Sequence, residues 1–267
     1  MNPSALGGGL DRRPQRLAAL REALGRADLD GLLVSSLPNV RYLTGFTGSN
    51  ALLLVTPLEL VLFTDFRYAA QVEDEVGGHA AVQFEPTSLW TGLWARLPAA
   101  TGVERIGFES AHLLHRDFSR LLEQGARWQW RPVVDCVEQL RECKDEGEVA
   151  CIERAVAIAE TALVRTLEQL RPGMTELAVA GLLEHQLRDA GSEGFPFETI
   201  VASGPRSALP HARASERVLG LGDFVLIDFG AVYAGYCADI TRTVVLGPAS
   251  ERQREIHDIV REANVRA

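Results

Sequence analysis

Positive charge is scarce in this sequence, and lysine occurs only once, as Lys144. The chain has 27 Lys+Arg residues against 36 Asp+Glu residues, which gives a formal net charge of −9 at pH 7. A general nucleic-acid binder needs a basic surface that contacts phosphates, and docking on an anionic membrane needs one as well. The composition therefore predicts a protein that binds neither nucleic acid nor membrane.

Long apolar runs and closely spaced cysteines are also lacking. The most apolar stretch, ALLLVTPLELVLF, is interrupted by Pro57 and Glu59 and is too short to span a membrane. The first residues, MNPSALGGGLDRRPQR, show no basic region followed by an apolar core, so we expect no secretory signal there. None of the four cysteines forms a CxxC pair, which disfavours a zinc or disulfide site. We predict free thiols and a cytoplasmic protein.

The chain has 267 residues, enough for one large domain or two ordinary ones. In the first half, short apolar runs such as GLLVSS, ELVLFTD and RIGFES alternate with helical patterns. This alternation predicts an α/β domain with a largely parallel or mixed sheet, which we assign to residues 1–137. Residues 138–267 are assigned to a second domain.

The second half begins with helices and ends with a hairpin and a further helix. Periodic apolar positions predict helices over residues 137–170, with a break near Lys144, and over residues 175–191. After the strand pattern FETIVASG comes a hairpin pattern, DFVLIDFGAVYAGYCADITRTVVLG. Ser250 is then suitably placed to cap the N-terminus of a final helix.

Two carboxylates, Asp228 and Asp239, lie in this otherwise apolar hairpin. We expect Ala234 and Gly235 to form a two-residue turn. Asp228 then faces Thr241, and Asp239 is the diagonal neighbour of Asp228 on the same face, with Cβ atoms at most about 7–8 Å apart. A four-residue loop would place the acids directly opposite each other, and only an odd loop length would separate them.

Two like charges this close on a half-buried face repel each other and lose hydration. One acid could stay protonated, an arginine could pair with both, or cations could bind between them. Arg242 is adjacent in sequence but points to the opposite face, so cation binding is favoured, and oxygen donors suit Mn, Co, Fe, Zn or Mg. The plain alternative is that Asp228 bridges a turn while Asp239 is a solvated strand residue.

His211 follows the turn-rich loop SGPRSALP. A neutral imidazole on a loop held by proline and glycine can donate to, or accept from, a substrate. The alternative is a histidine whose ring is satisfied by a backbone carbonyl. Four other histidines lie on helical patterns and are interpreted as surface or packing residues: His112, His115, His185 and His257.

The segment FETIVASGPRSALPHARASERVLGLGDFVLIDFGAVYAGYCADITRTVVLG resembles the catalytic domain of the pita-bread metallopeptidases. This family comprises Xaa-Pro aminopeptidases, prolidases, methionine aminopeptidases and creatinase. The earlier segment DGLLVSSLPNVRYLTGFTGSNALLLVTPLELVLFTDFRY resembles the amino-terminal domain of the Xaa-Pro aminopeptidase and prolidase branch. The resemblance implies an α/β N-terminal domain followed by an α+β pita-bread domain.

The resemblance also implies two divalent metal ions, Mn, Co or Zn, held by five side chains: two aspartates, a histidine and two glutamates. Asp228 and Asp239 match the two aspartates as metal ligands, and His211 matches the catalytic loop histidine that contacts substrate. Thr241, opposite Asp228 in the expected register, is placed to orient that carboxylate. The implied reaction is exopeptidase cleavage of proline-containing Xaa-Pro peptides by a metal-activated hydroxide, in a homodimer.

The sequence departs from the family pattern at Arg206, where the family often has asparagine, and after His211, where it often has glycine. The resemblance implies that the three remaining ligands, a histidine and two glutamates, lie on strands after the helix that ends at Ala267. His257 lies on the pattern of a packing helix of the family and cannot substitute for the missing histidine. We therefore expect a truncated pita-bread domain and little or no peptidase activity from this chain alone. Two alternatives stay open: a non-catalytic pita-bread module for peptide binding or assembly, and a creatinase-like amidinohydrolase.

Overall fold

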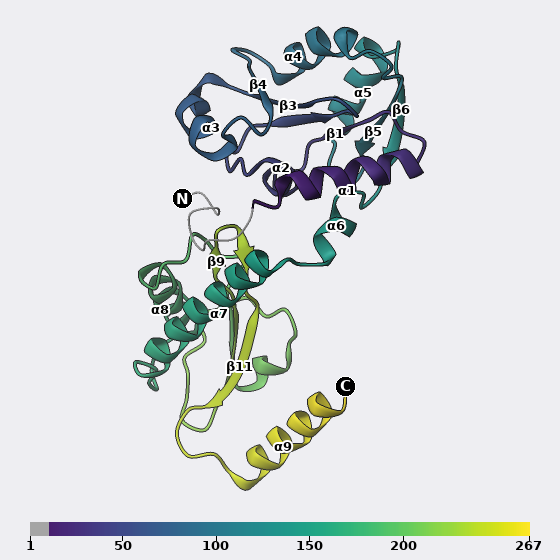
Figure 1. The fold of residues 1–267 in the computed structure, drawn as a ribbon. Coiled ribbons are helices and arrows are strands. Elements are labelled where there is room, and N and C mark those ends of the chain that lie inside the picture. The colour runs from purple at the N-terminus through teal and green to yellow at the C-terminus, as the bar shows by residue number, and fades with distance from the viewer. Residues whose placement is uncertain (1–10) are drawn as a thin grey trace. The chain divides into compact units, whose positions relative to one another are not determined.

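The computed structural model describes residues 11–267 (Figure 1). Residues 1–10, where we predicted no secretory signal, lie outside the described residues. The chain divides into two compact units, one ending at Lys144 and one beginning at Asp145. Among the described residues, no helix has the length and apolar character needed to cross a membrane.

The first unit is built on a six-stranded mixed sheet with the order β4-β3-β2-β1-β5-β6. Strands β1–β2 and β2–β3 pair antiparallel, while β3–β4, β1–β5 and β5–β6 pair parallel, as the mixed-sheet prediction allows. The strands are β1 (Gly31–Val34), β2 (Leu52–Val55), β3 (Leu60–Thr64), β4 (Ala81–Phe84), β5 (Arg105–Glu109) and β6 (Gln129–Val133).

Helices cover both faces of this sheet (Figure 1). Side chains alternate along each strand, so Leu32 packs into the core under α1, α2 and α3, while its neighbour Leu33 packs into the core under α4 and α5. The helices are α1 (Arg13–Arg26), α2 (Leu37–Thr44), α3 (Ala69–Val76), α4 (Leu89–Arg96), α5 (His115–Gln124) and α6 (Glu138–Glu142), with 3₁₀ turns η2 (Phe66–Tyr68) and η3 (Leu97–Ala99). His112 lies in a turn before α5, so its assignment to a helix was wrong.

The compact units divide after Lys144, whereas the sequence suggested a division after residue 137. Val137 is fully buried in the core of the first unit, and Leu140 packs against the same core. The Tyr42 hydroxyl also donates to the carbonyl oxygen of Leu140 (3.2 Å). These contacts attach α6 to the first unit, because burial of its apolar side chains is completed there.

All four tryptophans of the chain lie in the first unit, beside the core under α4. The Trp94 ring stacks with Trp90 and Trp128 at centroid distances of 6.0 and 6.5 Å. It meets Trp130 edge-on at 6.2 Å. Because the second unit has no tryptophan in its sequence, intrinsic tryptophan fluorescence reports on the first unit alone.

His79 follows α3, and its Nε2 donates to the carbonyl oxygen of Leu43 (3.1 Å). Burial, and then the nearby Arg13 guanidinium, lower the pKa of this imidazole from its ordinary value of 6.5. In the unfolded chain the imidazole regains the ordinary pKa. As the pH falls below the ordinary histidine pKa, proton uptake therefore favours the unfolded state. The contribution of neutral His79 to the stability of the folded state is fully present only above that pKa.

The first unit should consequently lose stability when the pH is lowered from about 7.5 to about 5. His79→Gln keeps a side-chain donor but cannot take up a proton, so it should flatten this dependence. Urea unfolding followed by tryptophan fluorescence measures the effect. His115→Gln, at an exposed histidine of the same unit, should keep the wild-type slope. A His79→Gln protein with an unchanged pH dependence would contradict this explanation.

The second unit packs two helices on one face of the three-stranded antiparallel sheet β11-β8-β7. The predicted helix break near Lys144 is confirmed, since Asp145 caps α7 and forms a capping box with Glu148. The predicted cap at Ser250 is also confirmed, and Thr175 caps α8. The elements are α7 (Glu146–Leu167), α8 (Glu176–Asp189), β7 (Ile200–Ser203), η4 (Gly204–Ala208), β8 (Phe224–Phe229), β9 (Val232–Tyr233), β10 (Tyr236–Cys237), β11 (Ile240–Val245) and α9 (Glu251–Arg266).

The two faces of this sheet differ in burial. Val225, Ile227 and Phe229 of β8 are fully buried in the core beneath α7 and α8. Leu226 and Asp228, which alternate with them, lie on the other face and are only half-buried. The sheet thus presents one open face, which carries the predicted functional residues.

Candidate metal centre

The hairpin has the predicted register. Asp228 of β8 lies opposite Thr241 of β11, and the same strand pairs on its other side with β7, where Ile200 lies opposite Asp228. Ala234 and Gly235 both have positive φ, 49° and 76°, as a two-residue hairpin turn of the primed type requires. The predicted turn and the predicted pairing of Asp228 with Thr241 are therefore confirmed.

Gly230 allows the two arms of the hairpin to approach closely just beyond Asp228. A Cβ atom at this position would lie 2.0 Å from the carbonyl oxygen of Ala238 and 2.5 Å from Cγ of Pro196. Next to it, the backbone N–H of Ala238 donates a hydrogen bond to the carbonyl oxygen of Ala231 (2.9 Å). Only glycine fits here, and the close approach fixes the backbone from which Asp239 projects.

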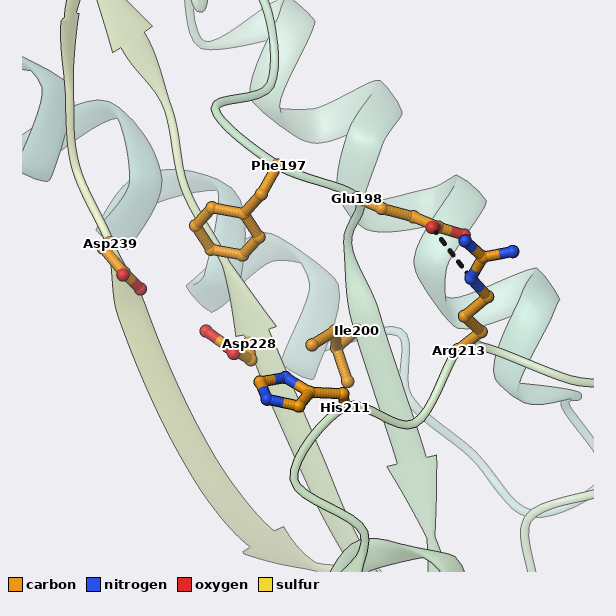
Figure 2. Close-up of a pocket in the computed structure, with 7 residues that line it drawn as sticks. All are labelled: Phe197, Glu198, Ile200, His211, Arg213, Asp228 and Asp239. Atoms are coloured by element: carbon orange, nitrogen blue, oxygen red, sulfur yellow. Dashed lines mark ion pairs between the residues drawn. The ribbon is translucent and has the colours of Figure 1, made fainter. Parts of the chain in front are cut away.

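Asp228, Asp239 and His211 line one pocket of about 380 Å³. In Figure 2, the two carboxylates and the imidazole are directed into this space from β8, from the residue before β11 and from the loop after η4. The structure thus brings together three side chains that the sequence analysis singled out. The complete lining is Phe197, Glu198, Ile200, His211, Arg213, Asp228 and Asp239.

The acids are more open to solvent than we expected. Asp239 is exposed and Asp228 is half-buried, so the prediction of a half-buried face is wrong for Asp239. The apolar residues that flank the acids in sequence point to the opposite, covered face, which explains the error. Within residues 11–267 neither acid forms an ion pair with an arginine, and Arg242 instead donates to the carbonyl oxygen of Thr241 (2.8 Å). Arginine pairing is thereby excluded for the described residues.

Thr241 forms a hydrogen bond with Asp228 across the pair of strands β8 and β11. Its Oγ1 donates to Oδ1 of Asp228 over 2.9 Å. A hydroxyl that holds one carboxylate oxygen restricts the rotation of the whole group, which is how residues beside a metal ligand orient it. The proposed orienting role of Thr241 is compatible with this contact.

Thr241→Val should lower the affinity of the chain for a divalent cation by about 10- to 100-fold, because the carboxylate of Asp228 loses its orienting donor. Valine keeps the shape and the strand preference of threonine. Thr243→Val is a matched control, since Thr243 is exposed on the same strand and lies opposite Leu226. Electron paramagnetic resonance of free Mn²⁺ measures the affinity, and equal affinities in the two variants would refute the role of Thr241.

His211 is exposed on its loop, and the structure assigns its ring no hydrogen-bond partner among the described residues. The alternative of a ring satisfied by a backbone carbonyl therefore does not hold for residues 11–267.

His257, Glu251 and Glu255 lie on α9, which carries no buried residue, and none of them lines the pocket. A packing helix was expected here, but within residues 11–267 the helix buries none of its side chains, and Gln253 Nε2 donates to the carbonyl oxygen of Gly222 (2.7 Å).

Several pocket residues were missed by the sequence analysis. Phe197 and Ile200 form an apolar part of the wall, and Arg213 pairs with Glu198 at 3.2 Å (Figure 2). Strand alternation could have indicated Ile200, because it lies directly opposite Asp228. The exposed ion pair carries no sequence signal, and such surface pairs contribute little to stability.

The donor set is compatible with a divalent cation, although it is small. Asp228 and Asp239 face one pocket and form no ion pair within residues 11–267, and hard or borderline cations prefer oxygen ligands. Among residues 11–267 no group of three or more His, Cys, Asp or Glu side chains is arranged to hold a metal. Asp228 and Asp239 would thus supply two of the five ligands that the resemblance implies.

Comparisons with known proteins agree with this architecture. Residues 150–267 match the model of metallopeptidase family M24, and residues 16–143 match the creatinase/prolidase N-terminal domain. The chain is 38% identical over 248 residues to the uncharacterized peptidase YqhT of Bacillus subtilis, covering 93% of this chain and 70% of the relative. The chain belongs to metallopeptidase family M24.

Other members of the M24 family extend the comparison. A Xaa-Pro dipeptidase of Pyrococcus horikoshii is 32% identical over 97% of this chain and 72% of its own length. The solved structure of a Xaa-Pro dipeptidase from Bacillus anthracis superposes with a TM-score of 0.89 at 35% identity, covering 95% of this chain and 71% of that one. The predicted family and the predicted pairing of an α/β domain with a pita-bread domain are confirmed.

Membership in the M24 family places the chain among peptidases that use divalent metal ions. The prediction of a metallopeptidase is thereby confirmed. The individual roles of Asp228, Asp239, His211 and Thr241 remain predictions.

Proposed function

We propose that this M24 protein serves the metal-dependent cleavage of Xaa-Pro peptides at their N-terminal residue. The observation that carries the proposal is the convergence of Asp228, Asp239 and His211 on one pocket in a chain whose relatives include Xaa-Pro dipeptidases. Two carboxylates from rigid strands suit cation binding, and the loop imidazole adds a group that can contact substrate.

In this proposal Asp228 and Asp239 hold divalent ions, with Mn, Co or Zn as candidates, and Thr241 orients Asp228. Divalent ions in such a site lower the pKa of water and polarise the peptide carbonyl. His211 hydrogen-bonds the carbonyl oxygen of the scissile peptide and stabilises the negative charge that develops there. Its exposure on the pocket leaves the ring free to make this contact.

The pocket also offers a surface that suits a prolyl ring. Phe197 and Ile200 contribute apolar area next to the acids. Proline has an apolar ring and no backbone N–H, so it fits an apolar wall without leaving a donor unsatisfied. This wall supports the assignment of proline-containing peptides as substrates.

The number of ligands sets the expected activity of the chain. Because Asp228 and Asp239 are two of five expected ligands, we propose that the 267-residue chain binds a divalent ion weakly and is nearly inactive by itself. A homodimer and a cytoplasmic location belong to the same proposal. The latter is supported by Cys136, Cys143, Cys151 and Cys237, which are all free thiols.

The test compares the chain with a fusion protein, in which residues 1–267 are joined to the part of the B. subtilis relative that they do not match. With Mn²⁺, the fusion protein should hydrolyse Xaa-Pro dipeptides and leave Xaa-Ala dipeptides intact, while the chain alone should release no product. Rapid Xaa-Pro hydrolysis by the chain alone would refute the ligand argument. A fusion protein that cleaves creatine, or no substrate, would refute the peptidase proposal.

A further inference from the structure

Glu176 is the first residue of α8, and its carboxylate is fully buried. Its Oε1 accepts hydrogen bonds from the backbone N (2.7 Å) and Oγ (2.8 Å) of Ser203. Its Oε2 accepts from the backbone N (3.1 Å) and Oγ (2.6 Å) of Ser215. Arg206 Nε also donates to Oε2, over 3.1 Å. One carboxylate thus binds both ends of the loop that carries His211.

Arg206 extends this contact across the loop. Its Nη2 donates to the carbonyl oxygen of Arg213 over 2.6 Å, two residues after His211. The segment before His211 and the segment after it are therefore both connected to Glu176, directly or through Arg206. This arrangement limits the conformations in which the loop can present the imidazole.

We propose that Glu176 is a positioning residue that holds the loop of residues 204–214 so that His211 faces the pocket of Asp228 and Asp239. The inference rests on the function proposed above for His211. Glu176 itself does not line the pocket, so it acts through the loop and not on substrate.

The chemistry of the contact requires a carboxylate. Burial raises the pKa of Glu176, but hydrogen bonds from Ser215 and Ser203 and the charge of Arg206 outweigh this and leave the pKa below its ordinary value. A buried carboxylate is tolerated when it is paired and fully bonded, and the N-terminus of α8 adds favourable electrostatics. A glutamine has one acceptor oxygen, and its amide nitrogen cannot accept from a backbone N–H.

Both ends of the loop have further anchors besides the Glu176 carboxylate. Arg217 Nη1 donates to Ser203 Oγ (2.6 Å) and pairs with Asp223 (2.8 Å), and Ser203 also pairs in the sheet with Val225. Ser215 is held by Glu176 and by a bond from Leu177 N to its carbonyl oxygen (3.0 Å). Glu176 joins the two ends through one group, so loss of its carboxylate should loosen the loop of residues 204–214, which includes Leu209, while the sheet stays in place.

The experiment measures amide hydrogen exchange in the metal-free 267-residue chain. The reporter is Leu209, whose N–H donates to the Arg206 carbonyl oxygen (3.0 Å) and does not contact Glu176. In Glu176→Gln, exchange at Leu209 should accelerate by about tenfold or more, because local opening of the loop becomes easier. Exchange at Leu183, in the core of α8, should stay unchanged. Glu160→Gln, at an exposed glutamate of α7, is the matched control and should change neither site.

Equal exchange at Leu209 in the wild type and Glu176→Gln would overturn the proposal, and so would equal acceleration at Leu209 and Leu183, which indicates a general loss of stability. The Mn²⁺ affinity should stay within about twofold of wild type, because Asp228 and Asp239 lie outside the loop. Ser215→Ala provides a milder variant if Glu176→Gln does not fold. It removes a single donor and should give a smaller acceleration at the same amide.

The proposed function is tested separately by hydrolysis in the fusion protein. There, Glu176→Gln should lower kcat on a Xaa-Pro dipeptide by about tenfold or more with a small change in KM, because His211 is misplaced as charge develops. An inactive fusion protein with selective acceleration at Leu209 would refute the function and still support loop positioning. An active fusion protein whose kcat is unaffected by Glu176→Gln would overturn the positioning role.

Discussion

Gly230→Ala should destabilise the second unit by about 3 kcal/mol or more, because the added Cβ would clash with backbone atoms that are held in the hairpin. The nearest atom, the carbonyl oxygen of Ala238, would lie 2.0 Å from that carbon. Relief of the clash requires the arms of the hairpin to separate, which would also displace Asp239. Calorimetric unfolding, together with hydrogen exchange in β8 and β11, measures the loss.

Gly181→Ala is the matched control for this substitution. Gly181 lies inside α8, and a Cβ there would meet no atom within 4 Å. Alanine has a higher helix propensity than glycine, so this variant should stabilise the unit by about 0.5–1 kcal/mol. Opposite signs for the two substitutions are expected, and a Gly230→Ala protein as stable as wild type would show that the close approach is not required.

Asp239→Asn and Asp228→Asn should each lower Xaa-Pro hydrolysis by the Mn²⁺-loaded fusion protein by about a thousandfold or more. Asparagine keeps the size of the side chain but removes the negative charge that the cations need. The measurement is kcat/KM on a Xaa-Pro dipeptide, with bound Mn²⁺ determined in parallel.

Asp258→Asn is the control for the two pocket variants, because Asp258 lies on α9, outside the pocket. It should retain full hydrolysis and full Mn²⁺ binding. Full activity of either pocket variant would instead show that the carboxylates do not hold the catalytic ions.

The hairpin could be predicted from sequence because its determinants are local. Ala234 and Gly235 adopt the positive φ values of a two-residue turn, and strand alternation then places Thr241 opposite Asp228. The fold class followed from alternating strands and helices and from the family resemblance. These features need no knowledge of contacts between distant segments.

Other features depend on contacts between distant segments and were missed for that reason. In the sequence, Glu176 resembles any glutamate in the first turn of a helix. Its carboxylate nevertheless accepts hydrogen bonds from Ser203 and Ser215, which only the folded chain brings close to it. The burial of Val137 in the first unit's core, which attaches α6 to that unit, also depends on residues far away in sequence. The exposure of Asp239 was also misjudged, since apolar neighbours in sequence said nothing about which face the helices cover.

Asp228 and Asp239 are proposed to form a divalent-cation site in this chain. Titration of the isotope-labelled 267-residue protein with Mn²⁺ tests it most directly, because the paramagnetic ion broadens nuclear resonances near its binding site even when binding is weak. Broadening should centre on the amides of His211, Asp228 and Asp239 and disappear in the Asp228→Asn/Asp239→Asn double variant. Broadening centred elsewhere, such as on the acids of α9, or unchanged in the double variant, would contradict the claim.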